Sequence, residues 1–73
     1  NPTSWILTLE SGNTEEVKYT IYLINIIGRV ILNQKMNVIG GKFDLDMTNV
    51  SSGVYMLRIK TNGKVQLIKV IKR

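Results

Sequence analysis

The sequence lacks cysteine and histidine altogether, and each absence removes a class of chemistry. Without cysteine, the chain can form no disulfide, no thiolate metal site and no cysteine nucleophile. Without histidine, it lacks the commonest general base and the commonest zinc ligand. We therefore predict a protein that is not an enzyme and that binds neither a metal nor a cofactor.

The chain is also short, and it contains no long apolar run. The 73 residues suffice for one small domain but not for a separate catalytic domain. The longest apolar stretch, 21–27, is interrupted by Asn25 and is far shorter than the roughly 20 residues of a membrane-spanning helix. We expect residues 1–73 to form a single domain without a transmembrane segment. Because the chain opens on Asn1-Pro2-Thr3 without an initiator Met, we interpret it as a piece of a longer protein.

Apolar and polar residues alternate with a period of two through most of the chain. Such alternation is typical of β-strands that place one face on a core, and Val, Ile, Thr and Tyr are favoured there. Turn signals rich in Gly, Asn and Ser separate the runs. Strands are expected at residues 5–10, 16–24, 29–36, 42–47, 54–61 and 64–72. Six short strands at this spacing predict an all-β fold, an antiparallel β-sandwich.

The last two expected strands form the clearest hairpin. Asn62-Gly63 between two alternating runs is a strong hairpin signal, and we predict a type I′ turn there. A two-residue loop predicts that Thr61 lies opposite Lys64, Tyr55 opposite Val70, and Met56 opposite Lys69. One face of the hairpin is then strongly apolar and should lie on the core, while the other face mixes aliphatic side chains with cations.

Charge is unevenly distributed along the chain. The net charge is +5, but residues 1–46 hold four Lys/Arg and five Asp/Glu, whereas residues 47–73 hold six Lys/Arg and no acid. The chain ends in a basic ribbon made of Lys64, Lys69, Lys72 and Arg73. One interpretation is edge protection, because lysines on an edge strand discourage aggregation. The other is an exposed last strand that a receptor binds by strand addition, steered by charge.

Several segments, taken together in order and spacing, resemble a known family. These segments are Asn1-Pro2-Thr3-Ser4, Tyr22-Leu23-Ile24-Asn25-Ile26-Ile27-Gly28-Arg29-Val30, Phe43-Asp44-Leu45, Gly53-Val54-Tyr55-Met56-Leu57-Arg58-Ile59, Asn62-Gly63 and Lys69-Val70-Ile71-Lys72-Arg73. The whole chain resembles the C-terminal sorting domain of proteins exported by the type IX secretion system (the Por system) of Bacteroidetes. The resemblance implies a small immunoglobulin-like antiparallel β-sandwich with Greek-key topology and six to seven strands, at the end of a larger cargo protein.

The resemblance also implies a function, that of a non-enzymatic C-terminal secretion signal. A cargo of this kind crosses the inner membrane with an ordinary signal peptide and is in transit in the periplasm. The type IX translocon and its shuttle components then direct it across the outer membrane to the cell surface or the medium. A sortase-like signal peptidase is expected to cut upstream of the domain.

The resemblance assigns two groups of residues. Recognition by the translocon is assigned to Gly53, Tyr55, Lys69, Val70, Ile71, Lys72 and Arg73. The domain boundary and turns are assigned to Asn1, Pro2, Thr3, Gly28, Asn62 and Gly63. Turn geometry explains Gly28 and Gly53 without any partner, and a core position with the hydroxyl at the rim explains Tyr55.

A second function also fits, that of an immunoglobulin-like accessory module that binds polysaccharide next to a catalytic domain. Trp5 and the tyrosines would then form an exposed platform, although we favour a Trp5 that packs over the open end of the core. Nucleic-acid binding is disfavoured, because aromatics are 7% of residues and alternate into apolar faces. The edge strands allow a homodimer.

Two smaller groups of residues have structural interpretations. Asp44 and Asp46 share one face of an expected strand, and no third ligand lies in the same run. We therefore expect a solvated face there rather than a calcium site or an acid–base pair. Met36, Met47 and Met56 are interpreted as gap-filling packing residues.

Overall fold

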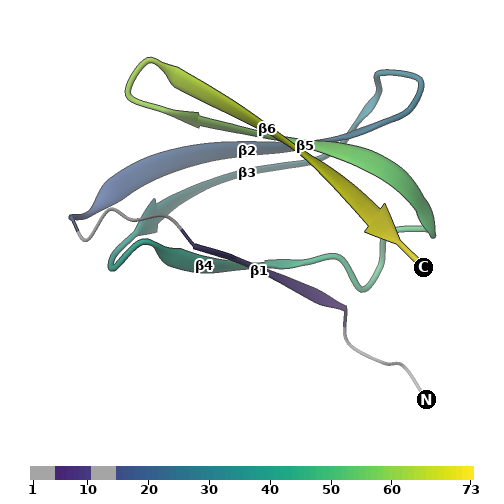
Figure 1. Ribbon diagram of the computed structural model, residues 1–73, viewed down its shortest axis with the longest axis horizontal. Helices are drawn as coiled ribbons and strands as arrows, with labels where there is room; N and C mark the ends of the chain where they lie inside the picture. The colour runs from purple at the N-terminus through teal and green to yellow at the C-terminus, as the bar shows by residue number, and fades with distance from the viewer. Residues whose placement is uncertain (1–4, 11–14) are drawn as a thin grey trace.

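The computed structural model describes residues 5–10 and 15–73 of the chain. These residues fold into two layers of β-strand, and the chain ends just after the last strand (Figure 1). The predicted boundary segment Asn1-Pro2-Thr3 lies outside the described residues. In the part of the chain that is described, no helix is long and apolar enough to span a membrane.

Within the described residues the chain forms six strands, the number that the alternation predicts. They are β1 (Ile6–Glu10), β2 (Val17–Asn25), β3 (Val30–Val38), β4 (Lys42–Asp46), β5 (Gly53–Thr61) and β6 (Lys64–Lys72). Most strand ends lie within one residue of the predicted ones. The exception is β3, which continues to Val38 because Val38 pairs with Val17 at the start of β2.

The strands form two antiparallel sheets. The first has the order β3-β2-β5-β6 and is named the large sheet; β1 and β4 pair to form the small sheet. In Figure 1 the small sheet lies along one face of the large sheet. The protein is therefore an all-β sandwich consistent with an immunoglobulin-like fold, which confirms the predicted fold class.

Apolar side chains between the two sheets form the core. Every second residue is buried in the middle strands of the large sheet, namely Tyr19, Ile21 and Leu23 in β2 and Tyr55, Leu57 and Ile59 in β5. The small sheet and the chain that follows it add Leu45, Met47 and Val50. The period of two in the sequence is the direct consequence of strands that turn one face toward this core.

The β5–β6 hairpin has the predicted register but not the predicted turn. Thr61 lies opposite Lys64, and the pairing continues without a shift to Gly53 and Lys72. A type I′ turn needs positive φ at both central residues, but φ is positive at Gly63 (+79°) and not at Asn62. This combination fits a type II turn, in which glycine at the second central position takes the positive φ.

Asn25 holds the turn between β2 and β3. The Gly28 N–H donates a hydrogen bond to the Asn25 carbonyl (3.0 Å). The Asn25 side-chain oxygen accepts from the N–H groups of Ile27 (3.1 Å) and Arg29 (2.9 Å). One asparagine side chain therefore satisfies two backbone donors of the turn, which is a common role of this residue type in loops.

Met56 lies on the outer face of the large sheet, where the predicted pairing opposite Lys69 places it. Met47 is buried and Met36 packs against the core, but Met56 is 38% exposed. Met56 lies between Tyr55 and Leu57, which face the core, so its own side chain has to point to the outer face of the large sheet.

Truncation of a core side chain should destabilise the domain strongly. Leu57 is fully buried, and Leu57→Ala is expected to lower the free energy of unfolding by about 2–5 kcal/mol, because a lost apolar contact and a new cavity add together. Urea denaturation followed by circular dichroism measures the change. Leu67→Ala is the matched control, because Leu67 is 59% exposed and its truncation should cost less than about 0.5 kcal/mol. Equal losses in the two variants would contradict the assigned core.

Candidate recognition site

The predicted recognition residues at the C-terminus differ in exposure. Lys69, Ile71 and Arg73 are exposed, whereas Val70 is buried in the core. The difference follows from strand alternation, which turns Val70 and Lys72 toward the small sheet and the intervening residues away from it. A partner can therefore contact the three exposed residues while the domain stays folded.

Lys72 connects β6 to the chain between β4 and β5. Its ammonium donates hydrogen bonds to the carbonyl oxygens of Met47 (2.7 Å), Thr48 (3.1 Å) and Val50 (2.5 Å). An ammonium has three N–H donors, and here each of the three has an acceptor. We name this arrangement the Lys72 bridge, because it crosses from the large sheet to the segment that follows the small sheet.

Trp5 lies beside the Lys72 bridge, just before β1. Its ring centroid is 6.0 Å from the Lys72 ammonium, a distance at which cation–π attraction still acts. The backbone N–H of Trp5 donates to the Thr48 hydroxyl oxygen (2.9 Å), and the backbone N–H of Met47 donates to the Trp5 carbonyl (2.8 Å). Trp5 is half-buried and packs against the core, as expected, but it lies at the end that the Lys72 bridge closes.

Asp46 receives hydrogen bonds from the residue two positions further along. The hydroxyl and the N–H of Thr48 both bond to the Asp46 carboxylate, the N–H at 2.9 Å, and they lower the pKa of Asp46 below its ordinary value. The nearby positive charge of Lys72 lowers this pKa further. Thr48 therefore links Asp46 to Trp5, since its hydroxyl oxygen also accepts the Trp5 N–H.

Gly53 and Tyr55 support the strand that carries Lys72. Tyr55 is buried, and its hydroxyl donates to the Ser51 carbonyl (2.5 Å). Gly53 has a φ of +156°, which residues with a side chain rarely adopt, and a Cβ there would lie 3.7 Å from the Tyr55 ring. Gly53 is also the residue opposite Lys72 in the hairpin. These contacts give Gly53 and Tyr55 a structural role in the domain.

The remaining predicted turn residues lie away from this corner. Asn62-Gly63 joins β5 to β6 at the opposite end of β6 from Lys72, and Gly28 lies between β2 and β3. The structure thus brings Gly53 and Tyr55 together with the C-terminal residues, but not the other glycines.

The two strand aspartates lie exposed, as the alternation predicts. Asp44 accepts a hydrogen bond from the Thr8 hydroxyl (2.7 Å) across the small sheet, and Asp46 binds Thr48. Among residues 5–10 and 15–73, no group of three or more Asp, Glu, His or Cys side chains could hold a metal ion. Each carboxylate therefore stabilises local structure.

The large sheet carries positive charge without negative charge. The sequences of its strands contain no Asp or Glu, and they contain Lys18, Lys35, Arg58, Lys60, Lys64, Lys69 and Lys72. The described acids lie in the small sheet or just before β2. The charge difference between the two halves of the sequence thus becomes a difference between the two sheets. A partner that approaches β6 meets a positive potential.

Sequence reasoning missed the Lys72 bridge, although a signal for it was present. In the predicted hairpin, Lys72 shares the core-facing side with Val70. The charged group of a side chain on the inward face of a strand must either donate hydrogen bonds to acceptors within the protein or extend past the core to water. The structure therefore distinguishes Lys72 from the other residues of the basic ribbon, because its ammonium bonds to carbonyl oxygens of the protein itself.

Comparison with models of protein families matches the entire chain, residues 1–73, to the secretion system C-terminal sorting domain. The chain belongs to this family. The match confirms the resemblance to type IX sorting domains, and it makes the chain a C-terminal sorting signal of type IX secretion. Searches of curated proteins and of solved structures returned no significant match.

Membership of the sorting-domain family has three consequences. It implies interaction with the secretion system, and export across the outer membrane to the cell surface or the medium. The family is one of sorting signals and is not catalytic.

Removal of the Lys72 ammonium should weaken the sorting domain. In Lys72→Met the carbonyl oxygens of Thr48 and Val50 lose the ammonium as donor, while that of Met47 keeps the Val50 N–H, so the free energy of unfolding should fall by about 1–3 kcal/mol. Urea denaturation measures the loss, and Trp5 fluorescence reports the altered environment of the ring. Lys69→Met is the control on the exposed face and should change stability by less than about 0.5 kcal/mol. A loss as large in Lys69→Met would refute the special role of Lys72.

The Asp46 carboxyl should titrate below the ordinary aspartate range in the folded domain. Its folded pKa is lower than its unfolded pKa, so its contribution to stability is present above the unfolded value and is lost as pH falls through the folded value. A carbon-13 NMR titration measures the pKa directly. Thr48→Ala should raise the pKa of Asp46 toward the ordinary value, whereas Thr8→Ala, which removes a hydroxyl bonded to Asp44, should not. An unchanged Asp46 titration in Thr48→Ala would contradict this cause.

Proposed function

We propose that residues 1–73 form a single C-terminal recognition domain that the type IX translocon reads in order to move an attached cargo across the outer membrane. The observation that supports this function is the exposed, positively charged β6 of a chain that belongs to the sorting-domain family. A folded signal of this kind needs no catalytic residue, because its role is to be bound by the protein machinery that moves the cargo.

The recognition surface that we propose is the outward side of β6 with the last residue. Lys69, Ile71 and Arg73 are exposed there, and Ile71 adds an apolar side chain between cations. Such a mixture suits a protein receptor, since cations steer the encounter and the apolar side chain gains from burial. Gly53, Tyr55, Val70 and Lys72 act through the fold, because they hold β6 in position.

The proposed route follows from this role. The cargo is in transit in the periplasm, where shuttle components and the translocon bind the domain, and it then reaches the cell surface or the medium. A sortase-like peptidase acts upstream of the domain, so that the folded sandwich remains an intact unit for recognition.

The aromatic residues do not support the platform that the polysaccharide-binding alternative needs. Tyr19 and Tyr55 are buried in the core, and Tyr22 is half-buried with the Arg58 guanidinium 6.0 Å from its ring centroid. Trp5 is half-buried, and the Lys72 ammonium lies 6.0 Å from the centroid of its ring. Stacking on a sugar needs exposed ring faces, so these residues do not favour a carbohydrate site.

Export of a reporter tests the proposed function and the proposed surface. A periplasmic reporter fused to residues 1–73 should reach the surface of a host with a type IX system, as measured by fractionation and protease accessibility. The double variant Lys69→Glu with Arg73→Glu should accumulate in the periplasm, because the charge that steers recognition is reversed. Failure of the unmodified fusion to leave the periplasm would refute the function.

A charge-matched control isolates the position of the cations. Arg29→Glu with Lys35→Glu changes the net charge by the same amount at the turn between β2 and β3 and on β3, which β2 and β5 separate from β6, and this fusion should be exported normally. Circular dichroism of both variants checks that the sandwich is folded. Equal export of the two double variants would remove the assigned role of Lys69 and Arg73.

A further inference from the structure

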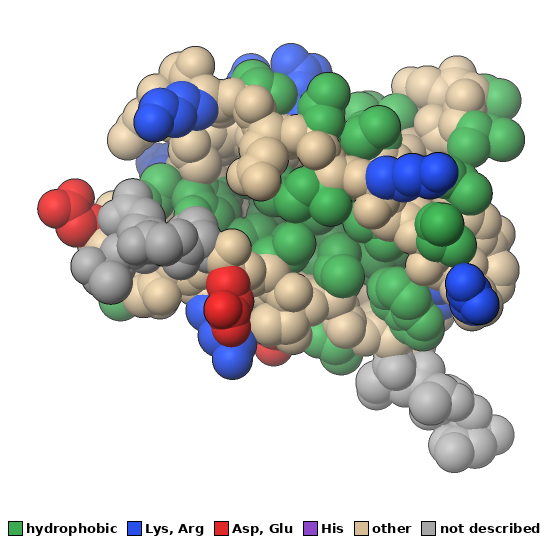
Figure 2. Space-filling view, viewed as in Figure 1, with side chains coloured by type: hydrophobic (Ala, Val, Ile, Leu, Met, Phe, Trp, Pro, Cys, Tyr) green, Lys and Arg blue, Asp and Glu red, His purple; other side chains and the backbone are tan. Residues whose placement is uncertain are grey.

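A cleft opens between the sheets on the side where β1 and β6 form their edges. It has a volume of about 380 Å³, and residues of both sheets line it. Figure 2 shows hydrophobic side chains gathered in the middle of this face, between the layers of the sandwich. Core residues are therefore accessible from one side of the domain.

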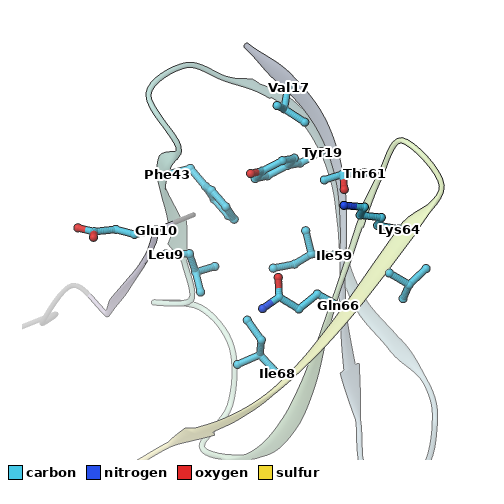
Figure 3. A pocket seen from close by; sticks show the side chains of 11 residues that line it. Leu9, Glu10, Val17, Tyr19, Phe43, Ile59, Thr61, Lys64, Gln66 and Ile68 are labelled. Atoms are coloured by element: carbon cyan, nitrogen blue, oxygen red, sulfur yellow. The ribbon is translucent and has the colours of Figure 1, made fainter. Parts of the chain in front are cut away.

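Apolar side chains form the interior of the cleft. Leu9 and Phe43 come from the small sheet, and Ile59 and Ile68 come from the large sheet (Figure 3). Phe43 packs edge-on against Tyr19, with 5.2 Å between the ring centroids. The interior thus offers a surface for aliphatic or aromatic side chains of a ligand.

Polar groups stand at the rim of the cleft. Lys64 and Gln66 lie on β6, and Glu10 lies at the end of β1. The Glu10 carboxylate is 3.9 Å from the Lys42 ammonium, which offsets its charge. The positive side of the rim is therefore β6, where Lys64 lines the cleft and the strand contains no acid.

Both strands that border the cleft have an edge available for pairing. Among the described residues, β6 pairs with β5 alone and β1 pairs with β4 alone. The outer backbone N–H and C=O groups of such a strand can bind an added strand. An edge beside an apolar cleft provides hydrogen bonds for the backbone of a ligand and burial for every second side chain.

The Lys72 bridge limits where a ligand can enter. It joins the C-terminal end of β6 to the segment 47–50, so that end of the sandwich is closed. Gln66 is exposed and Ile68 is half-buried, whereas Val70 is buried. The accessible edge therefore runs from Lys64 to Ile68, a length of about 17 Å at 3.3–3.4 Å per residue.

We propose that this cleft is a binding site for an extended segment of a translocon protein, which adds to the edge of β6 along Lys64–Ile68. The segment has alternating apolar residues that enter the cleft, and an acidic residue beside Lys64 at its rim. The positive charge of β6, without any acid in that strand, favours an acidic segment over a second copy of the same cationic strand. This inference rests on the proposed function, and it adds the site and chemistry of the partner.

Site-specific photo-crosslinking in exporting cells tests the cleft. Gln66, on the cleft side of β6, is replaced by p-benzoylphenylalanine in the exported reporter fusion, and the adduct is identified by mass spectrometry. The expected product is a translocon protein joined through a segment of alternating apolar residues with Asp or Glu. Ile26 is the control, because it is exposed in the turn between β2 and β3, and β2 and β5 separate β3 from β6. Crosslinking at 26 should not yield that segment.

A charge variant provides a second measurement. Lys64→Glu should lower the yield of the position-66 adduct by about threefold or more, the scale expected when one exposed charge pair is reversed. Lys35→Glu, with the same change in net charge on β3, should leave the yield unchanged.

The possible outcomes separate this inference from the proposed function. If the fusion is exported but position 66 yields no adduct, a lipid adduct or an adduct with a second copy of the domain, the cleft proposal is overturned and the sorting function stands. An adduct with a translocon protein through a helix or a basic segment also overturns it. If the unmodified fusion is not exported, the sorting function and the cleft proposal both fall.

Discussion

The Lys72 ammonium joins parts of the domain that are distant in the sequence. From the last strand it bonds to carbonyl oxygens of Met47, Thr48 and Val50, and it lies beside the Trp5 ring. Carbonyl groups in a segment without strand pairing need donors from elsewhere, and a single ammonium supplies three. In a domain of 73 residues, which buries a small core, this contact determines how the two sheets meet at one end.

The unequal size of the sheets has a consequence for the surface. The small sheet, β1 with β4, leaves part of β6 uncovered, and exposure along the inward side of β6 rises from buried Val70 through Ile68 to exposed Gln66. The Lys72 bridge closes the sandwich near Val70, while the end near the Asn62-Gly63 turn stays open. An apolar cleft beside a strand edge results from this difference.

The residues assigned by family resemblance divide into two kinds once the fold is known. Tyr55, Gly53 and Val70 hold β6 in place from within, whereas Lys69, Ile71 and Arg73 lie on the surface. A short stretch of one strand thus carries both kinds of residue, because neighbouring side chains point to opposite faces. A substitution at Tyr55, Gly53 or Val70 would reduce export because the domain loses structure. A substitution at Lys69, Ile71 or Arg73 would reduce export because the partner loses a contact.

Alternation in the sequence by itself determined the strands, the register of the β5–β6 hairpin and the core positions of Tyr55 and Leu57, because these depend on neighbouring residues and a period of two. The turn at Asn62-Gly63 was misjudged, since the backbone φ at Asn62 is set by the assembled hairpin. Only the tertiary structure decided the role of Lys72 and the presence of the cleft. The acceptors of Lys72 lie 22 to 25 residues earlier in the chain, and packing of one sheet on the other is what brings them within hydrogen-bond distance.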